Sequence, residues 1–377
     1  MITRFCSQKI ILPDSIMAGY VYVQDGKITA VTTDELPFDQ QIDCGENYLS
    51  PGFIEMHVHG GYGYDFGKCN AEEAAKAVAY HRSHGTTTLL PTLASAPIEE
   101  LSAAVDRLIP LFEQDKNVLG FHLEGPYFAI SQCGAQNTSF ITAPIREDYL
   151  PFLEKYSKYI ARWSYAPERD DGTFCDTLMQ FDVIPSAGHT DALGIELRAA
   201  AERGCRLTTH LYSCTSSITR EGGYRRTGVL EETMLNDDIY AEIITDGCHL
   251  PYDLIALTVK TKGRERVALC TDALSAAGQD ITEGNLNGIP FIVEDGVCRF
   301  PDRSAFCGSI ATSDRLVRTC IAAGISMVDA VYMAATTPAE ILGLAKGRIE
   351  VGRDADLLVF DDNINIQAVY LGGKETK

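Results

Sequence analysis

The chain has 377 residues, of which 45% are hydrophobic and 22% are charged, a composition typical of a globular protein with a large core. Its formal net charge of -20 repels polyanions and argues against nucleic acid as a partner. No apolar run reaches the roughly 18 residues that span a bilayer, so we expect no membrane partner. The start of the chain lacks a signal-peptide pattern and the 12 cysteines include no Cys-x-x-Cys pair, which predicts a cytoplasmic protein with reduced thiols.

The two ends of the chain carry similar β-rich patterns. Near the start, Asp25-Gly26 separates two strand-like runs, and this dipeptide is typical of a tight hairpin turn. Strand and turn patterns return over residues 346–361 and 366–374. Neither end has enough residues for a core of its own, and chain ends usually lie close together. We therefore predict that residues 1–49 and 346–377 form one small β-sandwich domain.

The middle of the chain, residues 50–345, alternates strand and helix patterns. Asn70 and Glu73 mark the start of one helix and Gly85 marks its end. The spacing of about 20 to 40 residues between strands leaves room for a helix in most gaps, which is the repeat of a parallel sheet. Eight such units predict a TIM-like (β/α)8 barrel as the catalytic domain. The predicted strands are 53–59, 86–90, 118–124, 161–166, 182–186, 205–210, 241–245 and 267–272.

The first of these strands contains the motif His57-Val-His59, followed by two glycines. Because side chains alternate along a strand, both imidazoles lie on the same side and converge on one point. Neutral imidazole nitrogens are good ligands for zinc and iron. The pair therefore indicates a metal site, provided that other ligands join it.

Further metal-competent residues fall at the ends of other predicted strands. The carboxyl ends of barrel strands open onto a common mouth, where the chemistry of such barrels takes place. This arrangement predicts that Glu124 bridges two ions, one of them held by His189 and His210. The complete predicted set is His57, His59, Glu124, His189, His210 and Asp272.

Two of the residues at the mouth are candidates for catalysis. Asp272 can be a metal ligand, a general base or both, and the alternative is a buried ion-pair partner. His249, just after the seventh strand, can polarise a substrate carbonyl or can be a packing residue. His122 shares the strand parity of Glu124, and we interpret it as a core or supporting group.

Several motifs, in this order, resemble the N-acetylglucosamine-6-phosphate deacetylases of the amidohydrolase superfamily. The resemblance covers nearly the whole chain, and the second to fourth motifs are the more specific ones. The motifs are Pro51-Gly-Phe-Ile-Glu-Met-His57-Val-His59-Gly, His122-Leu-Glu124-Gly-Pro-Tyr, Ser186-Ala-Gly-His189-Thr, Thr209-His210-Leu-Tyr, Asp246-Gly-Cys-His249, Thr271-Asp272-Ala and Gly352-Arg-Asp-Ala-Asp-Leu.

The resemblance implies hydrolysis of the acetamido group of an amino-sugar phosphate, with release of acetate. Glu124, His189 and His210 would bind the principal ion, and the His57 and His59 pair favours a second one. The cofactor would be zinc or iron, one or two ions per chain. A metal-bound hydroxide would attack the amide carbonyl, His249 would contact the substrate near it, and Asp272 would be the acid and base. The resemblance also implies a homodimer.

Candidate substrate-binding residues follow from the same resemblance. Arg225, in the basic loop after His210, resembles the first residue of the family's Arg-Glu-Pro-Gly motif, and guanidinium groups match phosphate geometry. Ser213 and Cys214 stand where the family has Asn-Ala and holds phosphate. Gln136 and Ser309 lie in segments that resemble family segments beside the substrate. Together with His249, these residues form the predicted substrate site.

Three departures from the family pattern leave the substrate open. Ser213 replaces an asparagine, Arg226 replaces a glutamate and Glu55 replaces an aspartate. Another N-acetylhexosamine, such as the galactosamine isomer or an unphosphorylated sugar, therefore stays an alternative. So does a different amidohydrolase acting on an N-acyl or cyclic amide, although such enzymes often use a carboxylated lysine on the fourth strand, where this chain has none. A non-catalytic binding protein is disfavoured because all six ligand-type residues are present.

Overall fold

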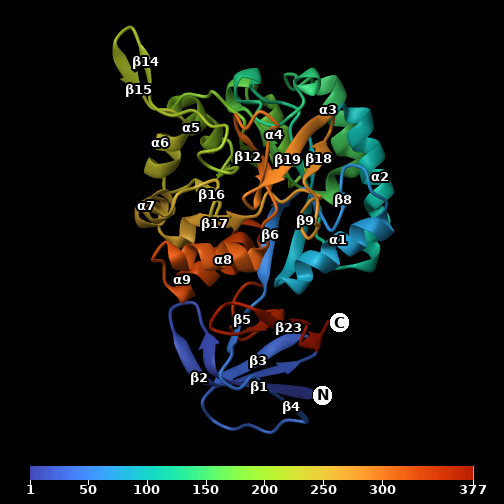
Figure 1. Cartoon of the computed structure of the whole chain (residues 1–377), viewed down its shortest axis with the longest axis vertical. Coiled ribbons are helices and arrows are strands. Elements are labelled where there is room, and N and C mark those ends of the chain that lie inside the picture. The colour runs from blue at the N-terminus through green and yellow to red at the C-terminus, as the bar shows by residue number, and fades with distance from the viewer. Residues whose placement is uncertain (377) are drawn as a thin grey trace.

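The computed structural model describes residues 1–376 and consists of a barrel with a smaller sheet at one end (Figure 1). The barrel sheet has eight parallel strands in the order β17-β16-β13-β12-β11-β10-β9-β6. Each of the eight predicted strands is present, so the predicted fold class is confirmed. The barrel strands are β6 (Phe53–Val58), β9 (Thr86–Ala94), β10 (Phe121–Glu124), β11 (Ile160–Tyr165), β12 (Ile184–Ala187), β13 (Leu207–Thr208), β16 (Tyr240–Ile244) and β17 (Val267–Cys270).

The barrel closes between its first strand and the segment that follows its last one. The backbone N–H of Asp272 donates to the carbonyl oxygen of His57 at 3.0 Å, and the N–H of His59 donates to that of Ala273 at 2.9 Å. These bonds place the residues after β17 directly beside the end of β6. The two ends of the sheet are thus joined at the carboxyl-terminal mouth, where the site lies.

Helices surround the barrel and bury their apolar faces against the strands (Figure 1). The predicted capping box at the first helix is confirmed, because the Asn70 side chain accepts from the Glu73 N–H and the Glu73 side chain accepts from the Asn70 N–H, both at 3.0 Å. The α-helices are α1 (Ala71–Ser83), α2 (Ile98–Gln114), α3 (Arg146–Tyr156), α4 (Thr173–Gln180), α5 (Gly194–Glu202), α6 (Val229–Leu235), α7 (Tyr252–Lys262), α8 (Ser313–Ala322), α9 (Met327–Val331) and α10 (Thr337–Ile341).

The smaller sheet combines strands from both ends of the chain. Its order is β24-β23-β22-β5-β1-β2-β3, and β4 pairs with β1. Apolar residues of its strands form a separate core that includes Phe5, Leu49 and Leu357. The strands are β1 (Ile2–Ile11), β2 (Ile16–Gln24), β3 (Lys27–Thr32), β4 (Gln40–Asp43), β5 (Tyr48–Pro51), β22 (Leu357–Phe360), β23 (Ile366–Leu371) and β24 (Lys374–Glu375). Strand β5 leads directly into β6 and connects the two parts.

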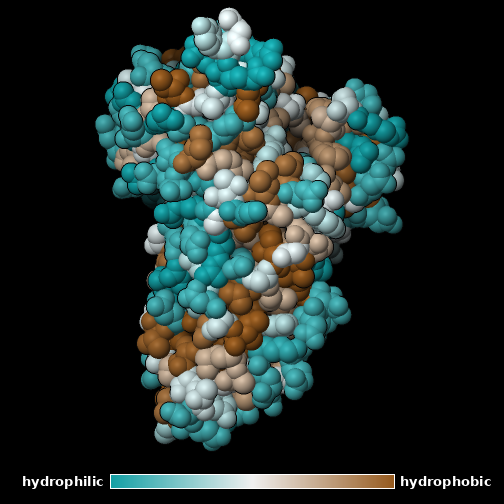
Figure 2. All heavy atoms as spheres, turned by 90° about the vertical axis from the view of Figure 1, so that its left-hand side faces the viewer, coloured by the Kyte–Doolittle hydropathy of each residue, from teal (hydrophilic) through white to brown (hydrophobic). Residues whose placement is uncertain are grey.

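Two insertions extend from the mouth of the barrel. One is a four-stranded antiparallel sheet of β18 (Glu283–Leu286), β19 (Ile289–Glu294), β20 (Val297–Arg299) and β21 (Phe306–Ser309). The other is a hairpin of β14 (Thr219–Glu221) and β15 (Tyr224–Arg226), which projects from the barrel at the top left of Figure 1. The face on that side mixes hydrophilic and hydrophobic residues (Figure 2). Over residues 1–376, no helix is both long enough and apolar enough to cross a membrane.

Candidate active site

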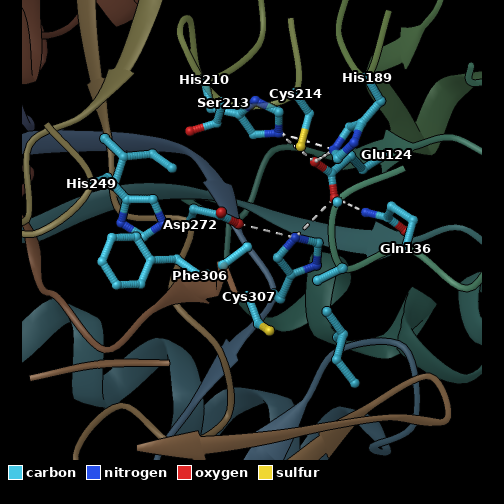
Figure 3. A pocket seen from close by; sticks show the side chains of 17 residues that line it. Glu124, Gln136, His189, His210, Ser213, Cys214, His249, Asp272, Phe306 and Cys307 are labelled. Carbon is cyan, nitrogen blue, oxygen red and sulfur yellow. Dashed lines mark hydrogen bonds and ion pairs between the residues drawn. The ribbon is translucent and has the colours of Figure 1, made fainter. Parts of the chain in front are cut away.

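The barrel brings all six predicted metal ligands together at its mouth, and Figure 3 labels four of them, Glu124, His189, His210 and Asp272. His57 lies in β6, Glu124 is the last residue of β10, and the other four follow the ends of their strands. The four histidines and Glu124 are buried, and the Asp272 side chain is 13% exposed. The predicted ligands thus share one buried, polar cluster.

Glu124 lies at the centre of this cluster. Its Oε1 lies 3.1 Å from His189 Nε2 and 3.0 Å from His210 Nε2, and these two ring nitrogens are 3.1 Å apart. Its Oε2 lies 3.1 Å from His59 Nε2. One carboxylate therefore faces two histidine groups, as a bridging ligand does.

The second histidine group includes Asp272. The Nε2 atoms of His57 and His59 are 3.3 Å apart, and Asp272 Oδ1 lies 3.4 Å from the first and 3.3 Å from the second. Four imidazoles and two carboxylates thus form two adjacent groups of ligand atoms that share Glu124.

These contacts fit a divalent cation better than a hydrogen-bond network. Two ring nitrogens that face each other need a shared proton or a cation between them. A tetrahedral ion with bonds of about 2.1 Å holds its ligand atoms about 3.4 Å apart, close to the separations in this cluster. Nδ1 of His59 and Nδ1 of His210 have no hydrogen-bond partner among residues 1–376, so neither ring is fixed by a second bond of its own. Nitrogen and oxygen donors of this kind suit a divalent metal.

The charges of the cluster also favour a bound cation. Burial lowers the pKa of His57, but the Coulombic attraction of Glu124 and Asp272 outweighs burial and raises it to about 10. Burial also lowers the pKa of His59, but its hydrogen bonds to Asp272 and Glu124, together with the negative charges of these carboxylates, raise it to about 9. Burial raises the pKa of Glu124, yet His57, His189 and His210 bring it well below its ordinary value. The two buried carboxylates are therefore stabilised by positive charge beside them, which either protons on the histidines or a metal ion can supply.

Three of the ligand-type residues have left-handed backbones. The φ angles are 48° at His189, 31° at His210 and 48° at Asp272. Residues other than glycine seldom adopt this conformation, and it costs free energy. Each residue comes shortly after its strand, and the sharp turn there brings its side chain to the mouth.

A cavity of about 230 Å³ lies against the metal cluster. Gln136, Ser213, Cys214 and His249, all predicted to bind substrate, line it together with Phe306. Its other walls come from the barrel and from the β18–β21 insertion. The cavity opens directly onto the cluster and has the place of a substrate pocket.

His249 is held across the cavity from the histidine cluster. Asp246 Oδ2 lies 2.8 Å from His249 Nδ1, and Asp246 Oδ1 accepts the His249 backbone N–H at 2.8 Å. An ionised carboxylate can only accept a hydrogen bond, so Nδ1 carries a proton in this pair. Nε2 is then the ring nitrogen available to contact a substrate in the cavity. The ring of Phe306 lies 5.0 Å away, centre to centre.

A model of the amidohydrolase family matches residues 48–376, nearly the whole chain. The chain belongs to the amidohydrolase family. It is therefore an enzyme of the hydrolase type, and its buried cluster contains ligand-type groups that suit a divalent metal.

Individual relatives of this amidohydrolase carry related names. The N-acetylglucosamine-6-phosphate deacetylase of Haemophilus influenzae is 26% identical over 368 residues, which are 95% of each chain. The N-acetylgalactosamine-6-phosphate deacetylase of a Shewanella species is 30% identical over 86% of this chain and 82% of the relative. A solved structure is also similar: an aspartate-to-alanine mutant of N-acetyl-D-glucosamine-6-phosphate deacetylase from Mycobacterium smegmatis, in complex with N-acetyl-D-glucosamine-6-phosphate. It has a TM-score of 0.92 and 28% identity and covers 99% of each chain.

Two predicted substrate residues of the amidohydrolase lie outside the cavity. Ser309 is fully buried, and its hydroxyl donates to the carbonyl oxygen of Thr271 at 2.5 Å, so it supports the loop that carries Asp272. Arg225 lies in the exposed hairpin strand β15, and its neighbour Arg226 pairs with Glu221 at 3.1 Å. The structure therefore does not bring Arg225 to the pocket of its own chain.

Glu55, which stands where the family pattern has an aspartate, connects two barrel strands. Its carboxylate accepts the backbone N–H of His57 and that of Thr271, both at 2.9 Å. Glu55 thus joins β6 to β17 below the metal cluster. Burial raises the pKa of Glu55 to about 8 although both hydrogen bonds lower it.

Sequence reasoning missed two buried charged residues under the cluster. Glu242 Oε1 lies 3.1 Å from His57 Nδ1, and Arg162 forms an ion pair with Glu242. The one available signal is the presence of a charged residue within each of two otherwise uncharged barrel strands. The predicted core position of His122 agrees with its neighbours, because its ring lies between the hydroxyls of Thr92 and Ser164 at 3.2 and 2.7 Å.

Proposed function

We propose that this amidohydrolase hydrolyses the acetamido group of N-acetylglucosamine 6-phosphate to glucosamine 6-phosphate and acetate. One observation carries the proposal: a metal-type cluster, Asp272 and the oriented ring of His249 all border one cavity. Full-length relatives with deacetylase names support the choice of reaction.

The residues divide the chemistry among themselves. A divalent cation in the cluster would polarise water and the substrate carbonyl. Asp272 accepts a proton as the oxygen of water adds to the carbonyl carbon. His249, protonated on both ring nitrogens, donates from Nε2 to the carbonyl oxygen and stabilises its developing negative charge, while its Nδ1–H stays bonded to Asp246. Asp272 then passes its proton to the sugar nitrogen as the carbon–nitrogen bond breaks, which leaves acetate and a free amine.

We propose zinc or iron as the metal, with one or two ions per chain. Glu124, His189 and His210 would hold the first ion, and His57, His59 and Asp272 would complete the second. Gln136 supports this set, because its Nε2 donates to Glu124 Oε2 at 2.6 Å and so fixes the bridging carboxylate. Metal content per chain, measured by elemental analysis, tests the stoichiometry.

A second candidate is another N-acetylhexosamine, such as N-acetylgalactosamine 6-phosphate or an unphosphorylated sugar. Two observations favour keeping it. A relative named for the galactosamine isomer matches at 30% identity. In addition, no lysine or arginine of the described chain lines the cavity, where Ser213 and Cys214 stand in the predicted phosphate region. Arg225 lies outside the cavity of its own chain, so it would provide the cationic contact for phosphate from the second copy of the proposed homodimer.

The test is acetate release by metal-loaded enzyme from the two 6-phosphates and the two unphosphorylated sugars. We expect the fastest turnover with N-acetylglucosamine 6-phosphate. Arg225→Ala should raise KM for the phosphorylated sugars, whereas Arg226→Ala is the matched control because Arg226 already pairs with Glu221. Equal rates with and without phosphate would contradict the phosphate assignment. No acetate from any sugar would favour an amidohydrolase of another N-acyl or cyclic amide.

The assembly and compartment belong to the same proposal. We propose a homodimer, as the resemblance of the sequence implies, and a cytoplasmic location, as the scattered cysteines indicate. Light scattering on the purified enzyme measures the mass of the assembly, and a mass of one chain would contradict the dimer.

A further inference from the structure

We infer that Glu242, held by Arg162, is a positioning residue that fixes His57 as a metal ligand and so controls binding of the ion on the His57, His59 and Asp272 side. The inference rests on the metal-dependent function proposed above. It concerns residues in the barrel core that do not line the cavity.

The contact between Glu242 and His57 sets the direction of the imidazole. Glu242 Oε1 lies 3.1 Å from Nδ1, and both side chains have zero exposure. An ionised carboxylate only accepts hydrogen bonds, so Nδ1 carries a proton and Nε2 is the ring nitrogen left to bind a metal ion. Nε2 is the atom that faces Glu124 and Asp272 at 3.4 Å. A carboxylate behind a histidine ligand commonly fixes its orientation and strengthens its bond to the metal.

Arg162 keeps the Glu242 carboxylate in place and ionised. Its guanidinium pairs with both oxygens of Glu242, and its Nη2 also donates to Ser186 Oγ at 3.1 Å and to Thr209 Oγ1 at 2.8 Å. The pair links β11 and β16 across the inside of the barrel, which ties the orientation of His57 to rigid elements.

A third metal site at this place is excluded by the same pair. His57, Glu242 and Cys270 offer ligand atoms within 4.8 Å of one another, which is the spacing of a possible site. The fully buried guanidinium of Arg162 already supplies the positive charge there, and it would repel a cation. Glu242 therefore acts on the metal only through His57.

The contacts of the other histidines indicate that replacing Glu242 should weaken only the ion on the His57 side. His189 Nδ1 lies 2.8 Å from the backbone carbonyl of Gln132, so that ring has an anchor of its own. His210 touches Glu242 only through its backbone N–H, at 3.3 Å, and an amide oxygen can accept this bond equally. Replacing the carboxylate thus changes the support of His57 and leaves the contacts of Glu124, His189 and His210 in place.

The experiment compares metal binding by Glu242→Gln and wild-type enzyme, with no substrate present. Glu232→Gln is the matched control: Glu232 is also buried and paired with an arginine, Arg198, but it lies in helix α6 and belongs neither to the cluster nor to the cavity wall. Zinc affinity is measured by competition with a chromogenic chelator, and zinc per chain by elemental analysis. We expect Glu242→Gln to weaken the ion on the His57 side about 10- to 100-fold and to leave the other ion unchanged. Unchanged binding of both ions, or an equal loss of both, would overturn the inference.

A measurement on the wild-type enzyme covers the case in which Glu242→Gln does not fold. Zinc-loaded protein labelled with 15N-histidine should show a protected, downfield Nδ1–H resonance from His57, absent in His57→Gln. If no such resonance disappears in His57→Gln, Nδ1 carries no proton and the inference fails. Because both readouts are independent of turnover, failure of the proposed sugar reaction would leave this result unaffected.

Discussion

Asp272 donates its backbone N–H to the carbonyl oxygen of His57 at 3.0 Å, and its carboxylate lies 3.4 Å from the Nε2 of the same histidine. The bond that closes the barrel and the contact that completes the metal cluster thus join the same two residues. Assembly of the cluster therefore depends on closure of the barrel. A variant that breaks the hydrogen bonds between β6 and the segment after β17 should lose metal and activity together.

Asp272→Asn should remove the proton transfers of the proposed mechanism. General acid–base catalysis typically contributes about 10²- to 10⁴-fold, so we expect kcat to fall by at least that much. The asparagine has nearly the same size, and the fold should be retained. Acetate release measures the effect, and circular dichroism checks folding. Turnover within about tenfold of wild type would contradict an acid–base role for Asp272.

His249→Phe should lower kcat about 10²- to 10³-fold, the usual cost of removing a donor to a developing oxyanion. The ring volume is nearly kept, so packing against Phe306 should survive. Asp246→Asn tests the orientation of His249, and we expect a smaller loss of kcat with little change in KM. Steady-state kinetics on the best substrate of the panel provides both values. Wild-type kcat in His249→Phe would show that the residue only packs.

Removal of the metal should abolish turnover and lower the melting temperature. A ligand that binds only the folded state stabilises it, and its loss removes that stabilisation. Dialysis against a chelator, followed by addition of zinc or ferrous iron, should first remove and then restore activity. Glu124→Gln should lose metal on both sides because Glu124 faces both histidine groups. Full metal content in Glu124→Gln would contradict the bridging role.

His81 should make the protein less stable in acid. This histidine is fully buried in α1, Nε2 lies 2.8 Å from the carbonyl of Gly60, and burial lowers its pKa to about 4. The unfolded state takes up a proton near pH 6.5 and the folded state only near pH 4, so the free energy of unfolding falls as pH drops between these values. The slope is about 1.4 kcal/mol per pH unit for one group.

His81→Gln keeps a donor for the Gly60 carbonyl and removes this titration. Urea unfolding of metal-free wild type and variant at pH 7, 6 and 5 should show the shallower loss in His81→Gln. Equal slopes in the two proteins would show that His81 does not carry the effect.

Trp163 should be important for the stability of the barrel beside the site. It is the one tryptophan of the chain, is fully buried, and donates from Nε1 to the carbonyl of Gly125 at 2.8 Å. Its ring lies 5.2 Å from that of Phe174 and 5.7 Å from that of Tyr127. Trp163→Phe removes the hydrogen bond and some volume, so we expect a loss of about 1–3 kcal/mol in the free energy of unfolding.

Because Gly125 follows Glu124, metal affinity should also fall in Trp163→Phe. Urea unfolding followed by circular dichroism measures the stability in both proteins. A loss of less than about 0.5 kcal/mol in the free energy of unfolding would contradict the stabilising role of Trp163.

The sequence by itself determined the (β/α)8 barrel and the six ligand-type residues. Side-chain alternation put His57 and His59 on one side of a strand, and parallel topology placed all strand ends at one mouth. These are local periodicities together with one topological rule, so no contact between distant residues had to be known.

The tertiary structure alone decided how the cluster is supported and what lines the pocket. The contact of Glu242 with His57 joins strands far apart in the chain and depends on the register of the closed barrel. Ser309 and Arg225 lie in segments after the strands, where no periodicity predicts direction; packing buried the first and left the second exposed on a hairpin. Burial and distance are properties of the assembled fold, and for this reason the sequence supplied the ligands of the site while the structure supplied their supports.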